Sequence, residues 1–202
     1  MKNKLSSRQK KALHTRKSLA ESAVKLFKEK GYENVNVEDI TQLARTSKGS
    51  FYTYFKSKDE VILDHYMQID DAYEKALTEQ PDGRSNEEQL LTVLQAGLLF
   101  SENLGHEFLS IVLSNQLTAN NEESLIIGKE RKLYPITTNI IEQGKTSGEF
   151  RFYGPTEDFV EMTLLFYRGL VFEYCLMKDP EIKLTLYAAE KIRTFIRKML
   201  IS

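Results

Sequence analysis

The sequence predicts an all-α fold, and three observations carry this prediction. Apolar residues recur at spacings of three and four along most of the 202 residues, which is the period of a buried helical stripe. Ser or Asn followed three residues later by an acidic residue, a pattern that caps helix N-termini, recurs between these stretches. No segment shows the alternation of a strand between turns, and there is no repeat of roughly 20–50 residues.

The composition is that of an ordinary globular protein, with 41% hydrophobic and 28% charged residues. The longest apolar stretch, 162–177, contains Arg168 and Glu173, so we do not expect a membrane span, which needs about 20 mostly apolar residues. The basic N-terminus lacks the apolar run of a secretory signal. Cys175 stands alone, which excludes an intrachain disulfide. We therefore expect a cytoplasmic protein without a membrane partner.

The first helix is expected over about residues 15–30. Its apolar face contains Leu19, Ala23 and Phe27. Thr15 is a plausible N-cap, and Gly31 is a plausible left-handed residue at the C-terminal end.

Two short helices and a longer one follow. Asn36, with an acid three residues on, predicts the start of the second helix, which ends near Arg45. A third helix begins after Ser47, with its buried stripe at Phe51, Tyr54 and Phe55. Ser57 opens a capping box and a fourth helix that extends to about residue 80.

The rest of the chain also predicts helices, at about 86–104, 106–118, 122–146, 156–177 and 181–200. Pro135 falls inside the helix expected at 122–146 and should kink or break it, because proline removes a hydrogen-bond donor. We expect two domains, 1–58 and 59–202. The first would hold three helices, and the second would be a larger helical domain.

The second and third helices, joined by a tight turn, form a helix-turn-helix, a motif whose second helix enters the DNA major groove. The first turn of the third helix carries Lys48 and no acid, although the helix dipole disfavours a cation there. We expect a DNA phosphate to supply the missing anion. Ser47, Ser50, Tyr52 and Thr53 add short hydrogen-bond donors, and Gly49 would let the backbone approach the groove.

Charge is divided along the chain. Residues 1–58 carry 14 Lys and Arg against 5 Asp and Glu, whereas residues 59–202 carry 14 against 24. A basic segment next to an acidic one favours a nucleic acid or membrane partner for the basic part. Each residue also has a simpler interpretation: Ser47 as a cap only, Gly49 for helix packing, Lys58 as a solvated charge. Taken together inside the basic region, these residues favour double-stranded DNA as the binding partner.

The segment from Thr15 to Leu63 resembles the TetR family of transcriptional regulators, above all in the run 47–55, Ser-Lys-Gly-Ser-Phe-Tyr-Thr-Tyr-Phe, and in the segments 23–32, 37–40 and 56–60. The resemblance implies a homodimeric, all-helical repressor with a ligand pocket in its C-terminal domain. It also implies roles by position, with Tyr52 and Lys58 on phosphates and Val37 near the flanking backbone. The full DNA-binding set expected is Arg45, Thr46, Ser47, Lys48, Gly49, Ser50, Tyr52, Thr53, Tyr54 and Lys58.

The turn departs from the family pattern. It reads Ala44-Arg45-Thr46 where the family usually has Ala-Gly-Val. A left-handed backbone costs arginine roughly 1 kcal/mol or more. Three interpretations remain open at this point: Arg45 is strained, the turn has another geometry, or Arg45 contacts a phosphate.

The second domain holds 15 of the 21 Phe and Tyr residues. Most should form the core, but a pocket between helices would be apolar with a few polar groups. The ligand-binding candidates are His65, Asn103, His106, Asn115, Phe166 and Arg168. By the resemblance, the last two helices would form the dimer interface, through Met162, Leu165, Gly169, Phe172, Leu186, Ala189, Ile192 and Ile196; the alternative is that these residues cover their own core.

An enzyme is the main alternative class, but the sequence contains no phosphate-binding glycine loop, no zinc motif and no nucleophile elbow. His14, His65 and His106 are far apart, so we expect no metal and no cofactor. A nonspecific DNA-compacting protein and an activator remain alternatives. The function we expect is a regulator that binds a palindromic operator as a homodimer and is released by a small apolar or amphipathic effector.

Overall fold

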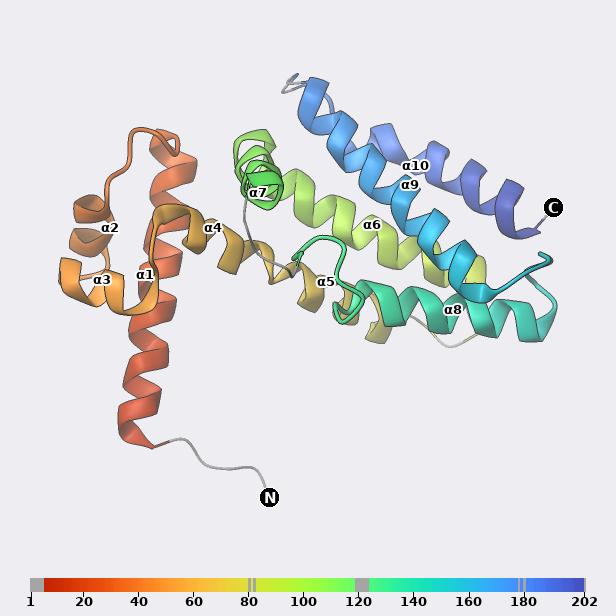
Figure 1. Ribbon diagram of the computed structural model, residues 1–202, viewed down its shortest axis with the longest axis horizontal. Coiled ribbons are helices and arrows are strands. Elements are labelled where there is room, and N and C mark those ends of the chain that lie inside the picture. The colour runs from red at the N-terminus through yellow and green to blue at the C-terminus, as the bar shows by residue number, and fades with distance from the viewer. Residues whose placement is uncertain are drawn as a thin grey trace. The chain divides into compact units, whose positions relative to one another are not determined.

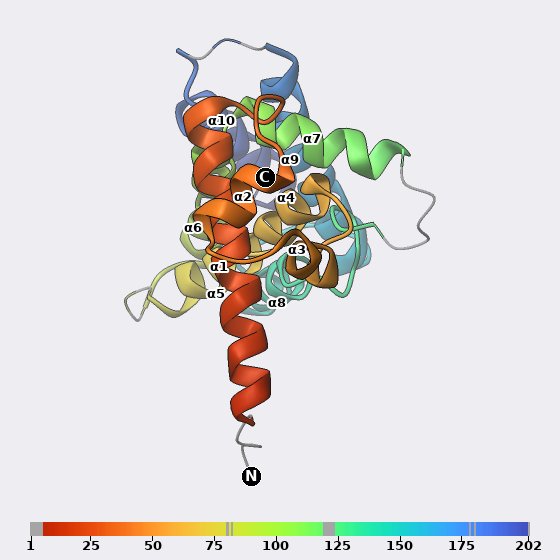
Figure 2. The same ribbon diagram turned by 90° about the vertical axis from the view of Figure 1, so that its left-hand side faces the viewer.

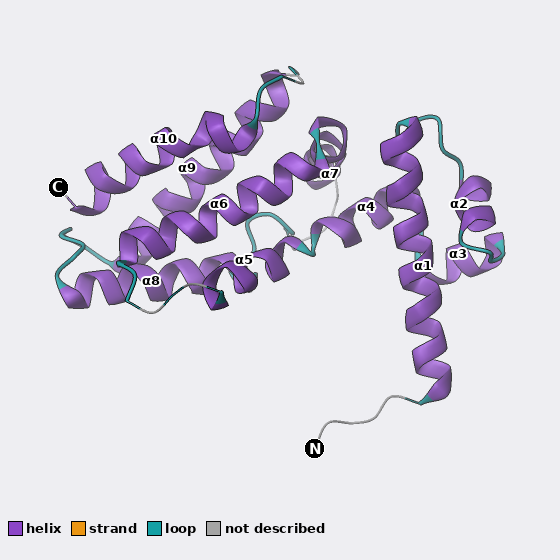
Figure 3. Cartoon of the chain, turned by 180° about the vertical axis from the view of Figure 1, so that it is seen from behind, coloured by secondary structure: helices purple, strands orange, loops and turns teal. Residues whose placement is uncertain are grey.

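The computed structural model describes residues 6–79, 81, 83–118, 124–177, 179 and 181–201. These residues form helices joined by loops, and there is no strand among them (Figure 3). The all-α prediction is therefore confirmed. Within the same residues, no helix combines the length and apolar character needed to cross a membrane.

The chain divides into two compact units, Met1–Met67 and Gln68–Ser202. The division lies further along than the 58/59 boundary that the sequence indicates, because α4 packs against α1. The helices are α1 (Ser7–Lys30), α2 (Val37–Leu43), α3 (Lys48–Tyr54), α4 (Lys58–Tyr66), α5 (Ile69–Thr78), α6 (Asn86–Leu104), α7 (His106–Thr118), α8 (Leu133–Ser147), α9 (Thr156–Met177) and α10 (Leu184–Ile196), followed by a π-helical turn, η1 (Arg197–Ile201).

Helix α1 begins well before the predicted residue 15. Ser6 and Gln9 form a complete capping box, in which each side chain bonds the other residue's backbone N–H. Thr15 is not the N-cap that the sequence suggested; it lies inside the helix, and its hydroxyl donates to the carbonyl of Lys11 at 3.0 Å. The N-terminal turns of α1 that lie before residue 15 carry basic residues.

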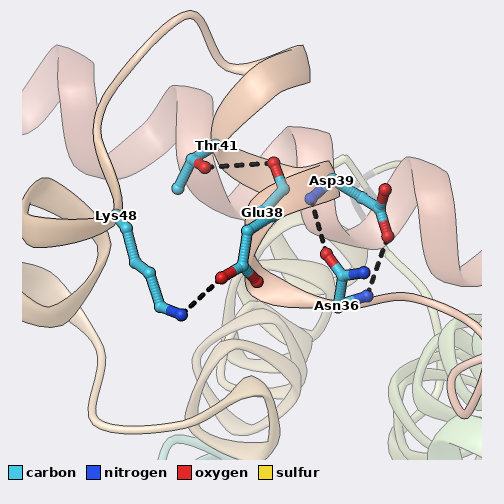
Figure 4. Close-up of polar contacts among 5 residues, drawn as sticks. All are labelled: Asn36, Glu38, Asp39, Thr41 and Lys48. Atoms are coloured by element: carbon cyan, nitrogen blue, oxygen red, sulfur yellow. Dashed lines mark hydrogen bonds and ion pairs between the residues drawn. The ribbon is translucent and has the colours of Figure 1, made fainter.

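The predicted starts of α2, α3 and α4 are confirmed. Asn36 and Asp39 exchange two hydrogen bonds of 2.9 and 3.0 Å at the start of α2 (Figure 4). The Ser47 hydroxyl accepts from the backbone N–H of Ser50 at 3.1 Å, and the Ser57 hydroxyl caps α4 in the same way. These caps satisfy backbone donors that a helix N-terminus leaves unpaired.

Three other predictions about helix boundaries are wrong. The helix expected from residue 57 to 80 is interrupted at Met67 and Gln68, where no Gly or Pro signals the break. Pro135 neither kinks nor breaks a helix, because α8 begins only two residues before it and a first-turn N–H has no intrahelical partner. The expected start of that helix at 122 lies outside the described residues, but residues 124–132 are described and form turns, so the predicted helix is wrong over this part. The last predicted helix, 181–200, agrees closely with the structure, in which α10 is followed by the π-helical turn.

In the second unit, α6 is the central helix and contacts α5, α7, α8, α9 and α10 (Figure 1). Gly97 lies where α5 and α9 meet it. The hydroxyls of Tyr73 and Tyr167, 3.2 Å apart and both buried, cover this glycine. A Cβ at position 97 would lie 2.3 Å from the Tyr167 hydroxyl and 2.4 Å from the Tyr73 ring. The absence of a side chain is what allows the three helices to approach here.

Gly97→Ala should destabilise the second unit by about 1–3 kcal/mol, because the two tyrosines must leave their places in a packed core. The free energy of unfolding from denaturant titration measures this. Gln95→Ala, at an exposed position on the same helix, is the control and should change stability by less than about 0.5 kcal/mol. Adding Tyr73→Leu to Gly97→Ala should recover part of the loss; strictly additive losses would contradict this account.

Candidate nucleic-acid interface

Helix α3 has one buried and one exposed face. Phe51 is fully buried, and the residues on the opposite face, Lys48, Gly49, Tyr52 and Thr53, are exposed. A Cβ at Gly49 would meet only the Ser47 hydroxyl, at 3.8 Å, so helix packing does not require glycine there. The helix therefore presents a lysine, a tyrosine, a hydroxyl and a stretch of bare backbone to solvent.

The turn between α2 and α3 is a Schellman motif. The N–H of Thr46 donates to the carbonyl of Thr41 at 2.9 Å, and the N–H of Arg45 donates to that of Gln42 at 3.2 Å. Arg45 has a φ of 54°, the single positive φ of a non-glycine residue in the described part of the chain. The turn keeps the left-handed residue that this geometry needs, and an arginine holds that conformation at a cost of about 1 kcal/mol.

Lys48 has an anionic partner within the protein. Its ammonium donates to the carboxylate of Glu38 on α2, and Figure 4 shows the two side chains meeting between the helices. The first turn of α3 therefore does not lack an anion within the protein, as the sequence suggested, because Glu38 lies ten residues earlier in the chain but close to Lys48 in the fold. The hydrogen bond lowers the pKa of Glu38 and raises that of Lys48. Both groups are exposed, so salt and competing anions can replace the pair.

Lys58 is not simply solvated. Its ammonium donates to the carbonyls of Tyr32 and Val35 at 2.9 and 2.6 Å and lies 4.1 Å from the centre of the Tyr32 ring. The Tyr32 hydroxyl in turn donates to Asp59, and burial together with that carboxylate raises the pKa of Tyr32. Lys58 thus holds the α1–α2 loop against the start of α4.

A basic cleft in the first unit brings together residues that sequence reasoning included and some that it missed. Its volume is about 540 Å³. The turn and α3 contribute Ala44, Arg45, Thr46, Ser50 and Tyr54, and α1 contributes Arg8, Lys11, Ala12, His14, Thr15 and Ser18. The α1 residues before position 15 were missed because the helix was expected to begin there, and the capping box at Ser6 is the signal that would have found them.

Two of the ligand-binding candidates line different hollows of the second unit. Arg168 lines a cavity of about 670 Å³ with Tyr134 and Leu164, whereas Phe166 lines a separate groove of about 710 Å³ formed by α9 and α10. His106 stacks on Tyr174, with ring centres 4.0 Å apart. Asn103 is exposed on α6, Asn115 is half-buried on α7, and His65 is on α4 in the first unit.

The residues expected at a dimer interface fall into three groups by exposure. Ile192 and Ile196 are buried within their own unit, because this face of α10 packs against α6, so they are core residues and the prediction is wrong for them. Ala189 is half-buried. The others form an exposed apolar surface on α9 and α10: Met162, Leu165, Gly169, Phe172 and Leu186, with Leu176 in addition.

Comparison with known proteins identifies the helix-turn-helix. The family described as "Bacterial regulatory proteins, tetR family" matches residues 19–64, from α1 through α4. The segment 19–64 is therefore similar to the DNA-binding part of TetR-family regulators. A similar curated relative is the HTH-type transcriptional regulator TcmR of Streptomyces glaucescens, 37% identical over 78 residues, which are 39% of this chain and 34% of TcmR. The HTH-type transcriptional repressor NicS of Pseudomonas putida is 27% identical over 145 residues, 68% of this chain and 66% of NicS.

The likeness in structure covers nearly the whole chain. Thermus thermophilus FadR, described as a TetR family transcriptional repressor in complex with lauroyl-CoA, has a TM-score of 0.67 at 18% identity, over 93% of this chain and 96% of that one. The sequence match to TcmR spans only about a third of the length of TcmR, whereas the likeness in fold to FadR spans nearly the whole chain. The matched segment contains the helix-turn-helix, and the relatives named here are described as transcriptional regulators.

Glu38→Gln should raise DNA affinity several-fold. Removing the carboxylate releases the Lys48 ammonium for a phosphate, and one more phosphate contact steepens the dependence of log K on log salt by about 0.9. Fluorescence anisotropy with a duplex across a salt series measures both quantities. Glu29→Gln removes an exposed acid that pairs with Lys25 on α1, and is the control. Equal effects of the two variants would mean that only net charge matters.

Proposed function

We propose that this chain is a TetR-family repressor that binds a palindromic operator as a homodimer and leaves it when a small apolar or amphipathic effector binds. The observation that supports this best is the exposed face of α3, where Lys48, Gly49, Tyr52 and Thr53 surround bare backbone, opposite the buried Phe51. A short helix that is buried on one face and exposed on the other can enter the major groove with its exposed face. The first unit is the DNA-binding domain of this proposal, and the second is its effector and dimerisation domain.

The proposed DNA contacts divide by chemistry. Ser47, Lys48, Gly49 and Thr53 lie on the face toward the groove, where the Lys48 ammonium would exchange Glu38 for a phosphate at the groove edge. Tyr54 lies on the side of α3 toward α1 and lines the basic cleft. Tyr52, Ser50, Thr46 and Arg45 contact the backbone, since hydroxyl and guanidinium groups are common phosphate donors. Lys58 contributes chiefly by holding the α1–α2 loop, because two of its donors are already used on carbonyls.

The homodimer is supported by the exposed apolar surface of the second unit. Leu165 and Leu176 are 70% and 63% exposed, and Leu186 on α10 is 78% exposed. Gly169 lies between the first two on α9 without any atom near its missing Cβ, which leaves room for another helix. Isologous pairing of this surface would give the two-fold symmetry that a palindrome requires.

The effector site proposed here is the cavity of about 670 Å³ lined by α9 and the segment before α8. Its wall combines apolar side chains with charged ones of both signs, which suits an amphipathic molecule: Ile127, Met162 and Leu164 with Lys129, Arg168, Asp158 and Glu161. The lauroyl-CoA bound to Thermus thermophilus FadR is a compound of this kind and a suitable first probe. Binding would release DNA by favouring one of two arrangements of the reading helices, with α4 as the connection.

The central experiment is selection of purified protein against random duplex DNA at two salt concentrations. We expect one two-fold palindrome to be enriched at both, with half-sites about one turn, ~34 Å, apart. The selected duplex is then titrated with lauroyl-CoA and related compounds to test release. Binding without enrichment, lost steeply as salt rises, would leave only nonspecific phosphate contact and would overturn the proposal.

Leu165→Glu combined with Leu176→Glu should convert the dimer to a folded monomer, because each dimer would bury four carboxylates without partners. Analytical ultracentrifugation gives the mass, and circular dichroism checks the helix content. Affinity for the selected palindrome should fall at least tenfold through loss of the second half-site. Leu117→Glu, at a position 79% exposed on α7, is the matched control and should stay dimeric. A dimeric double variant would place the interface elsewhere.

A further inference from the structure

The basic cleft of the first unit is a cationic surface without an internal anion. Arg8, Lys11 and Arg45 line it, and none of them forms an ion pair within the described part of the chain. Elsewhere in the same unit basic side chains do have acidic partners: Arg16 pairs with Asp64, Lys17 with Glu21, and Lys48 with Glu38. No carboxylate is among the residues that line the cleft.

The remaining polar side chains that line the cleft carry hydrogen-bond donors, which phosphate oxygens can accept. Hydroxyls come from Ser18 on α1, from Thr46 in the turn, and from Ser50 and Tyr54 on α3, and His14 adds an imidazole. Guanidinium, ammonium and hydroxyl groups converging on one concave surface are the usual composition of a protein contact to the nucleic acid backbone. The chemistry of the cleft therefore fits a phosphodiester rather than an apolar ligand.

The cleft also lies next to the proposed reading helix. Ser50 and Tyr54 belong to α3 itself, on the side that faces α1. The N-terminal turns of α1 project past α2 and α3, as the two views in Figures 1 and 2 agree. A duplex that takes α3 into its major groove would bring one edge of that groove toward these turns. Arg45, held in a strained left-handed conformation at the same place, supplies a cation that glycine would not.

We propose that this cleft binds a backbone phosphate of DNA flanking the half-site read by α3, which makes the N-terminal turns of α1 a second DNA-binding element. The proposal rests on the proposed function and extends it, since none of Arg8, Lys11 and His14 belongs to the helix-turn-helix. Together with Arg45 they would form one contact that positions α3 along the duplex without reading sequence.

The test compares two double variants of the full chain that remove the same charge. Arg8→Ala with Lys11→Ala alters the cleft. Lys17→Ala with Lys25→Ala alters exposed lysines on α1 outside the cleft, each paired with a glutamate one turn away. Affinity is measured over a salt series with the selected palindrome and with a random-sequence duplex of equal length. The cleft variant should flatten the slope of log K against log salt by about 0.9 for each phosphate that is no longer bound, on both duplexes.

Ethylation interference on the selected palindrome then locates the bound phosphate. In the wild type, ethylation of a phosphate outside each half-site should weaken binding, and this interference should disappear in the cleft variant only. Equal slopes for the two double variants would overturn the cleft assignment while leaving palindrome recognition intact. Failure of the wild type to enrich a palindrome would instead overturn the proposed function, and the random duplex would still report on the cleft. Binding of inorganic phosphate that the cleft variant loses, together with equal salt slopes on DNA for the two double variants, would assign the cleft to a free anion.

Discussion

Burial of Phe51 and Phe55 is the interaction on which the DNA-binding geometry depends. Helix α3 has seven residues, too few to be stable alone, so its existence and direction come from packing. Both rings are almost completely buried, and the Arg16 guanidinium lies 5.0 Å from the centre of the Phe55 ring while pairing with Asp64 on α4. One aromatic cluster therefore joins α1, α3 and α4. Once Phe51 points inward, helical geometry directs Lys48 and Tyr52 outward.

Features that depend on neighbours in the sequence could be predicted, and those that depend on distant residues could not. The caps at Asn36, Ser47 and Ser57 involve residues three positions apart, and the structure confirms all three helix starts. The partner of Lys48 is ten residues away on another helix, and the carbonyls held by Lys58 are more than 20 residues away. Exposed charge in a sequence pattern does not reveal whether the fold already supplies a counter-charge.

The second unit shows a similar limit for apolar residues. Leu186 and Ile192 recur on α10 with spacings that suit a buried stripe, yet Leu186 is 78% exposed and Ile192 is 2% exposed. The spacing identifies an amphipathic helix, but the position of α6 decides which of its apolar residues are buried in the core of the unit. The likeness of fold to proteins with little sequence identity has the same origin, because many residue sets can fill a helical core of given volume.

The turn at Arg45 has a consequence for how this regulator can vary. A screen of variants for thermal stability would favour glycine at position 45, since glycine adopts the left-handed backbone without strain. On the proposed phosphate contact of Arg45, a screen for residence on DNA would retain a long cationic side chain there. The two screens would therefore select different residues at position 45. With arginine there, the domain is less stable than the same fold would be with glycine.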